Sequence, residues 1–227
     1  MKNILVLCVL VFATTYAKAQ YKFLATNSSN QFTAKIFVAD CANGVCGGKA
    51  TIILFDKATE AELQTFNSSD LDFTLSANQN ANLGWLDLGK YQTPLVFGDF
   101  NFDGFEDLAI RNGSRGAYNE PSYDVYLNGN GNKFVLNEAL TKLASDNLGM
   151  FDVDRKLKQL VIHQKDGCCY DKTINYSYDN KKGLTEVSSV IEDSSIGDDV
   201  TVITQKMVDG KVKRKVERFK IKDYYKQ

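Results

Sequence analysis

The chain has 227 residues, with 27 Lys and Arg against 28 Asp and Glu, so its formal charge at pH 7 is −1. Such a near-neutral balance gives no general reason to expect nucleic acid as a partner. Only two prolines, beside 14 Phe and 11 Tyr, favour an ordered, strand-rich domain over a linker or a disordered chain.

The first nineteen residues have the pattern of a secretory signal peptide. Lys2 supplies a positive start, residues 4–13 form an apolar run too short to span a bilayer, and Ala17-Lys18-Ala19 is a small-residue cleavage site. We therefore expect a single mature domain, residues 20–227, in the periplasm or outside the cell. Cleavage would remove Lys2 and Lys18 and leave 25 basic residues against 28 acidic ones, a formal charge of about −3.

Period-two alternation of apolar and polar residues dominates the mature chain and predicts antiparallel strands. The one good helical pattern is residues 137–145, where Leu140, Leu143 and Ala144 fall on one face. Asp209-Gly210 suits a tight hairpin turn. The expected strands, in chain order, cover residues 34–38, 50–55, 71–75, 94–97, 107–111, 123–127, 157–163, 173–178, 184–191, 200–208 and 212–222.

A weak internal echo guides the choice of architecture. Phe97-Gly98-Asp99 leads into the strand at 107–111, and Met150-Phe151-Asp152 leads into the strand at 157–163. Both copies run from an aromatic residue through an acidic loop to an apolar strand, with the spacing of propeller blades. We predict an all-β, antiparallel fold with one short helix, arranged as an irregular propeller-like barrel or a β-sandwich, and favour the propeller-like form.

Four cysteines remain after removal of the signal peptide: Cys41, Cys46, Cys168 and Cys169. An even number in an oxidising compartment predicts two disulfides, with three possible pairings. Cys41 and Cys46 flank a turn-like stretch, whereas Cys168 and Cys169 are adjacent and form either a vicinal bridge or two cross-links to the first pair. Zinc is a weaker interpretation because the spacing is not C-x-x-C.

The segment 99–107 has the pattern of a calcium loop. Oxygen-bearing side chains stand at loop positions 1, 3, 5 and 9, Gly104 stands at position 6, and the carbonyl at position 7 can add a ligand. Because position 12 is Ile110 in an apolar strand, the loop is not an EF-hand; its flanking strands resemble the integrin-type, or FG-GAP, loop. The expected Ca²⁺ ligands are Asp99, Asn101, Asp103, Phe105 and Asp107.

A long Gly/Asn/Ser loop follows the acidic loop, between the strands at 107–111 and 123–127. Arg115 and Tyr118 stand among small residues there, and both residue types are favoured anchors at protein interfaces. A rigid scaffold presents contacts through such loops. The sequence therefore makes this loop the first candidate for partner binding.

The chain also resembles a family of bacterial periplasmic immunity proteins that inhibit lysozyme-like peptidoglycan hydrolases injected by rivals. The resemblance lies in residues 97–127, residues 133–140 and Gly167-Cys168-Cys169-Tyr170. It implies that calcium stiffens the base of an inhibitory loop whose tyrosine, here Tyr118, enters the hydrolase cleft. Further contacts or shaping roles are implied for Ser114, Arg115 and Gly116. The family commonly has a glycine pair where this chain has Asn119-Glu120.

We expect no enzymatic activity. The chain has neither G-x-S-x-G nor H-E-x-x-H, and its one histidine, His163, fits an exposed strand position. The alternative function is a calcium-stabilised adhesin or carbohydrate-binding module. Trp85, Tyr91 and Tyr126 could then form a sugar-binding platform, although by default we expect these aromatic side chains to be buried in the core. The basic end, residues 206–227, is interpreted as a solvated hairpin whose lysines block aggregation.

Overall fold

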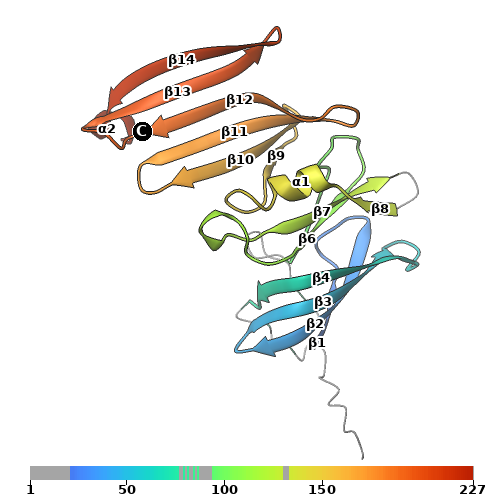
Figure 1. Ribbon diagram of the computed structural model, residues 1–227. Helices are drawn as coiled ribbons and strands as arrows, with labels where there is room; N and C mark the ends of the chain where they lie inside the picture. The colour runs from blue at the N-terminus through green and yellow to red at the C-terminus, as the bar shows by residue number, and fades with distance from the viewer. Residues whose placement is uncertain are drawn as a thin grey trace, which may run out of the picture.

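The computed structural model describes residues 21–76, 79, 81, 84, 86, 94–129 and 133–226 (Figure 1). The expected signal peptide, Trp85 and Tyr91 lie outside these residues. Within them the chain forms three antiparallel sheets, each with its strands paired in chain order. No helix in these ranges is long and apolar enough to cross a membrane.

The first sheet is a four-stranded meander that contributes one apolar face to the core. Its strands are β1 (Tyr21–Ala25), β2 (Phe32–Ala42), β3 (Val45–Asp56) and β4 (Glu62–Thr74). Along β2, Phe32, Ala34, Ile36 and Val38 are buried while the residues between them are partly exposed. This alternation follows from the period of the pleat, because successive side chains point to opposite faces.

The second sheet is the middle layer. It consists of β5 (Leu95–Gly98), β6 (Asp107–Arg111), β7 (Tyr123–Gly129) and β8 (Lys133–Leu136). All five residues of β6 are buried. Leu108 and Ile110 pack in the core shared with the first sheet, whereas Ala109 packs in a second core on the opposite face. A strand covered on both faces is expected to be buried continuously.

The second core joins the middle sheet to the third sheet through a short helix. Helix α1 (Glu138–Leu143) buries Leu140 and Leu143 in this core, which also contains Leu160 and Ile174. Its first turn is capped by Asn137, whose side chain accepts a hydrogen bond from the Leu140 N–H at 2.9 Å. The 3₁₀ turn η1 (Ala117–Asn119) lies between β6 and β7.

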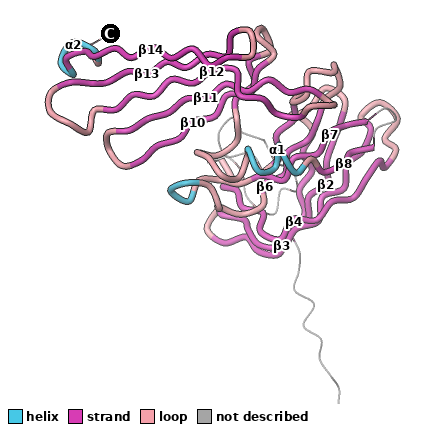
Figure 2. Tube along the Cα trace, turned by 45° about the horizontal axis from the view of Figure 1, so that its top comes forward, coloured by secondary structure: helices cyan, strands magenta, loops and turns pink. Residues whose placement is uncertain are grey.

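The third sheet has six strands and reaches beyond the two-core body (Figure 2). Its far edge is β14 (Lys211–Lys220), and the short helix α2 (Ile221–Tyr224) follows it. The strands are β9 (Asp152–Asp154), β10 (Gln159–Asp166), β11 (Tyr170–Asp179), β12 (Gly183–Asp193), β13 (Asp199–Val208) and β14 (Lys211–Lys220).

The all-β, antiparallel class is confirmed, and the packed first and second sheets form a sandwich. The preferred propeller-like arrangement is wrong, because the described strands stack in layers and close no barrel. The two copies of the sequence echo are not equivalent. Phe97 packs against the first core, whereas Phe151 lies in the second, with its ring 5.4 Å from that of Phe100.

Most element predictions agree with the structure, but several boundaries differ. The helix is shorter than predicted, and the last expected strand ends at Lys220, because α2 begins at Ile221. Because of α2, the described chain has two short α-helices rather than one. The pattern also missed β1, β8 and β9, which are short, and residues 62–70 of β4.

The structure resolves the cysteine pairing that the sequence left open. Cys41 and Cys46 are bonded across the β2–β3 hairpin, where they are direct strand partners. Cys168 and Cys169 form a vicinal disulfide in the β10–β11 turn. Each bridge is therefore local and closes a single turn.

Candidate functional site: the acidic loop and the Tyr118 loop

The acidic loop connects β5 to β6 and turns back through backbone hydrogen bonds to its own side chains. The Asp99 carboxylate accepts from the N–H groups of Asp103 and Gly104, each at 3.0 Å. The Asp103 carboxylate accepts from the Phe105 N–H at 2.9 Å. Gly104 has φ of +93°, a conformation that glycine adopts at little cost.

Asp107 anchors the base of this loop. Its side chain is fully buried and accepts hydrogen bonds from the N–H groups of Phe100, at 2.7 Å, and Asn128, at 2.8 Å. Burial raises the pKa of the Asp107 carboxyl to about 7; these two hydrogen bonds oppose the increase, and the charges of Asp103 and Asp99 add to it. A buried carboxylate beside two others is a group that a cation would stabilise.

The donor chemistry of the loop fits a hard cation, since all five expected ligands offer oxygen. Within the described residues, however, no group of three or more Asp, Glu, His or Cys side chains converges as a metal cluster. The carboxylates of Asp99, Asp103 and Asp107 accept backbone N–H groups instead. Their oxygens would have to turn inward, or share their lone pairs, to surround an ion.

The loop that follows β6, residues 112–122, is fastened on one side to β4. The Ser68 hydroxyl donates to the Arg111 carbonyl at 2.8 Å, and the Gly113 N–H donates to the Asp70 carbonyl at 2.7 Å. The Arg111 guanidinium lies 2.9 Å from the carboxylate of Asp72. These contacts fix where the loop leaves the body.

On its other side, the loop rests on the segment after α1. The Ala117 N–H donates to the Asn147 carbonyl at 3.1 Å, and the Asn147 side chain is held by Gln164 and by the Leu143 carbonyl. A Cβ at Gly116 would lie 2.7 Å from the Asn147 carbonyl oxygen, so the backbones touch there. Gly116 is buried at this close approach.

Tyr118 stands at the exposed end of this loop. Its side chain is 61% exposed, although its hydroxyl accepts a hydrogen bond from the Gly167 N–H at 2.7 Å. Tyr118 and Asn119 have φ of 59° and 63°, a conformation that is uncommon for residues other than glycine. Asn is among the residues that best tolerate this geometry.

The remaining candidates surround Tyr118 at different depths. Arg115 is 59% exposed in its side chain, with its guanidinium 3.8 Å from the Asp124 carboxylate. Ser114 is exposed, and its hydroxyl accepts a hydrogen bond from Arg111 at 3.2 Å. Arg115 and Tyr118 are thus both exposed in this loop, as is Glu120.

Sequence reasoning missed the groups that position this loop. Asn147 and Gly167 carried no signal of their own, because each acts through a backbone group. Gly167 belongs to the Gly-Cys-Cys-Tyr motif that supports the family resemblance, but nothing in the motif indicates contact with a residue 49 positions earlier. The contact depends on how the third sheet packs.

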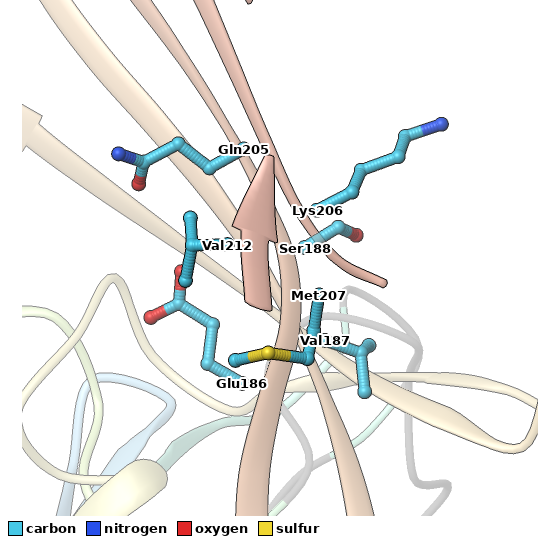
Figure 3. A pocket seen from close by; sticks show the side chains of 7 residues that line it. All are labelled: Glu186, Val187, Ser188, Gln205, Lys206, Met207 and Val212. Atoms are coloured by element: carbon cyan, nitrogen blue, oxygen red, sulfur yellow. The ribbon is translucent and has the colours of Figure 1, made fainter. Parts of the chain in front are cut away.

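Other surface features are less suited to a functional role. A pocket on the third sheet is lined by residues of β12, β13 and β14, and Figure 3 shows the neighbouring side chains of Gln205 and Lys206 pointing to opposite sides of the strand. His163 is half exposed, as predicted, 3.6 Å from Asp152. Tyr126 packs against the first core, with its ring 4.8 Å from that of Phe66, so it is not part of an exposed platform.

Comparison with known proteins gives a shared fold and no family. No family model matches the chain, and no curated protein matches it. Its structure is similar to one described as a Xanthomonas type IV secretion system related protein, with a TM-score of 0.65. The similarity covers 89% of this chain and 96% of that chain at 17% sequence identity.

Proposed function

We propose that this chain is a periplasmic or secreted immunity protein that binds and inhibits a lysozyme-like peptidoglycan hydrolase, without being an enzyme itself. The hydrolase would be an effector delivered by rival bacteria. The structural neighbour is related to a type IV secretion system. This context is compatible with the proposal, although the likeness itself extends only to the fold.

The observation that carries the proposal is the presentation of Tyr118. An exposed aromatic side chain usually keeps much rotational freedom, which a partner must remove at an entropic cost. Here the backbone on both sides of Tyr118 is hydrogen-bonded, and the hydroxyl is held by Gly167. A pre-organised tyrosine of this kind is a good anchor for a protein interface.

The chemistry of a muramidase cleft fits this anchor. Such clefts carry two carboxyl groups on either side of the scissile glycosidic bond. A tyrosine hydroxyl can donate a hydrogen bond to a carboxylate, and a guanidinium such as that of Arg115 can pair with its charge. Tyr118 in the cleft would exclude the polysaccharide, so inhibition requires no reaction by this chain.

We propose that calcium stiffens the base of the Tyr118 loop. Asp99, Asn101, Asp103 and Asp107 would hold the ion with the Phe105 carbonyl. The ion would neutralise carboxylates that otherwise repel one another. Support comes from the all-oxygen donor set and from the buried carboxyl of Asp107, whose backbone hydrogen bonds join the loop to β7.

The test is a cell-wall clearing assay with a panel of lysozyme-like hydrolases, including any encoded beside this chain. We expect the mature protein to inhibit at least one, and Tyr118→Ala to weaken that inhibition at least about thirtyfold, since interface hot spots contribute about 2 kcal/mol or more. Tyr225→Ala is the matched control, because Tyr225 is similarly exposed, at 56%, and lies next to α2.

Calcium is tested separately by thermal unfolding with added CaCl₂ or chelator. Ligand binding to the folded state raises the unfolding temperature. The wild type should show this increase, and the double variant Asp99→Asn with Asp103→Asn should not.

Inhibition that is absent across the panel, together with retention on glycan in a pull-down, would favour the carbohydrate-binding module instead.

A further inference from the structure

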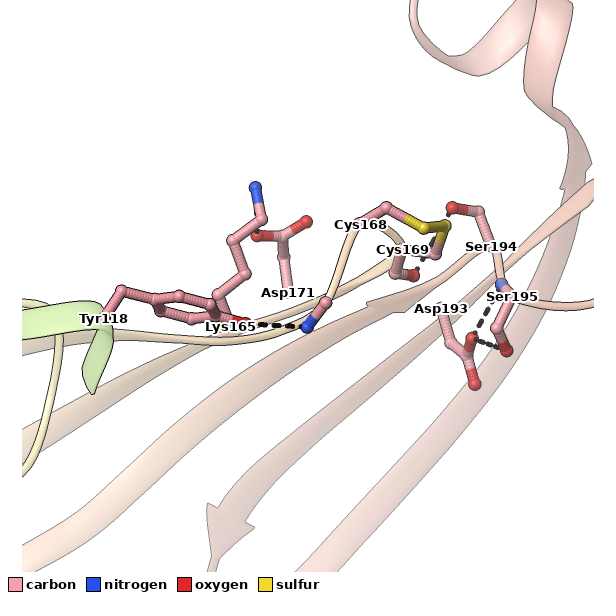
Figure 4. Close-up of a disulfide and its surroundings, with 9 residues drawn as sticks. Tyr118, Lys165, Cys168, Cys169, Asp171, Asp193, Ser194 and Ser195 are labelled. Atoms are coloured by element: carbon pink, nitrogen blue, oxygen red, sulfur yellow. Dashed lines mark hydrogen bonds and ion pairs between the residues drawn. A yellow bond between two sulfur atoms is a disulfide. The ribbon is translucent and has the colours of Figure 1, made fainter.

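The turn between β10 and β11 lies against the tip of the Tyr118 loop. It contains Gly167, Cys168 and Cys169, and the vicinal disulfide joins the two cysteines. The Gly167 N–H donates to the Tyr118 hydroxyl oxygen at 2.7 Å. Figure 4 shows Tyr118 and the disulfide of this turn in one view. The contact joins two segments that come from different sheets.

The turn is fastened on its far side as well. The Cys169 carbonyl accepts a hydrogen bond from the Ser194 N–H at 2.8 Å and another from the Ser194 hydroxyl at 3.3 Å. Ser194 follows the end of β12, so the turn is held by the neighbouring strand. A disulfide between adjacent residues further restricts the backbone that carries Gly167. The turn thus forms a constrained support for Tyr118.

The direction of the Gly167 hydrogen bond determines what Tyr118 can offer to a partner. A phenol has one O–H donor and an oxygen that accepts. Because Gly167 supplies the N–H, the oxygen is the acceptor in this bond and the hydroxyl hydrogen stays available. Hydrogen bonds in a chain polarise one another, so accepting from Gly167 makes the hydroxyl a stronger donor.

We propose that the Cys168–Cys169 turn is a positioning element of the inhibitory site, which orients the Tyr118 hydroxyl as a donor toward an ionised carboxylate of the partner. This inference rests on the function proposed above and specifies the partner group. Gly167, Cys168 and Cys169 act through Tyr118, and the partner is met by the phenol. The second disulfide, Cys41–Cys46, lies in the first sheet and provides a matched control.

A partner-free experiment tests the contact. In ¹H–¹⁵N spectra of the mature protein, the Gly167 amide should shift and exchange faster with solvent in Tyr118→Phe, which keeps the ring and removes the hydroxyl. The combined change Cys168→Ser with Cys169→Ser should have the same effect, and Cys41→Ser with Cys46→Ser should not. A Gly167 amide that is unchanged in Tyr118→Phe overturns the inference whatever the hydrolase does.

A double-mutant cycle then tests the role in inhibition, with the panel hydrolase that the wild type inhibits most strongly. We expect Tyr118→Phe and the Cys168/Cys169 double change each to weaken inhibition about tenfold. Together they should weaken it less than twofold beyond Tyr118→Phe alone, because the turn acts through the hydroxyl. If the fold-losses of the two single changes multiply in the combined variant, the turn and the hydroxyl contribute independently, and the positioning role is overturned.

Further outcomes separate this inference from the function on which it rests. If Tyr118→Ala abolishes inhibition but Tyr118→Phe does not change it, the ring is the anchor, and the hydroxyl donor is disproved while the proposed function stands. If Tyr118→Ala does not weaken inhibition, the chain inhibits through another surface, and the donor role is disproved. If the wild type inhibits no hydrolase of the panel, the proposed function itself fails. Circular dichroism melting of each variant establishes that it is folded.

Discussion

The middle sheet and the outer end of the third sheet are built from similar alternating strands but have opposite environments. Every residue of β6 is buried between two cores, whereas nine of the ten residues of β14 are exposed. The loop after β6 is held from two sides, and the hairpin at the end of the third sheet projects from the body. Pre-organisation therefore arises where separate layers meet.

Charge separates the two regions further. Residues 206–227 carry nine Lys and Arg against three Asp and Glu, although the whole chain is nearly neutral. Lysines along an edge strand discourage the pairing of that edge with another chain. The outer hairpin is thus basic and exposed, whereas the Tyr118 loop is held by hydrogen bonds to two neighbouring segments.

The largest contrast between the two regions should come from deleting apolar side chains. Leu108 is fully buried, so Leu108→Ala should lower the free energy of unfolding by about 3 kcal/mol through lost burial and a residual cavity. Val212 on β14 is 60% exposed, and Val212→Ala should cost less than about 0.5 kcal/mol. Urea unfolding measures both. Equal losses would mean that the outer hairpin is part of the same cooperative core.

A glycine pair gives the next largest contrast. Gly116→Ala should cost about 1 to 3 kcal/mol, because its Cβ would lie 2.7 Å from the Asn147 carbonyl oxygen and 2.8 Å from that of Glu120. We expect inhibition to weaken with it, since the loop must shift. A Cβ at Gly210 would have no atom within 4 Å, so Gly210→Ala should cost only the strain of its positive φ, about 1 kcal/mol. If Gly116→Ala unfolds like the wild type, the close approach at Asn147 is absent.

Hydroxyl groups give a smaller contrast. Ser68→Ala removes the hydrogen bond from β4 to the Arg111 carbonyl and should cost about 1 kcal/mol, because that carbonyl and Ser68 are buried. Ser195, in the turn after β12, donates to Asp193 at an exposed position, and Ser195→Ala should change stability by less than about 0.5 kcal/mol. Thermal unfolding of both variants measures this difference in stability loss. Equal losses would mean that the hydrogen bond from β4 does not hold the loop.

The smallest effect on stability is expected at the partner-facing side of the loop. The Arg115 pair with Asp124 is long, at 3.8 Å, and the Arg115 side chain is 59% exposed, so Arg115→Gln should cost less than about 0.5 kcal/mol. Its effect on inhibition should be larger, about three- to tenfold, if the guanidinium pairs with a carboxylate of the hydrolase. A loss of stability without a loss of inhibition would place Arg115 among the structural residues.

Local sequence determined a large part of this protein. Period-two alternation located most strands, since the pleat requires it, and the Cys41–Cys46 spacing suited the hairpin that the structure shows. The acidic loop and its glycine follow from the spacing of oxygen donors within nine residues. Tyr118 was indicated by family resemblance and by its small neighbours, and the structure places it at an exposed position.

Only the tertiary structure decided which surfaces meet. The sequence of β6 does not show that both faces of this strand are covered. The apparent repeat at Phe97 and Phe151 is not structural, because Phe97 packs against the first core and Phe151 lies in the second. The support of Tyr118 by Gly167 is likewise a contact between distant backbone groups. Such contacts carry no side-chain signature, because they depend on the packing of layers rather than on local preference.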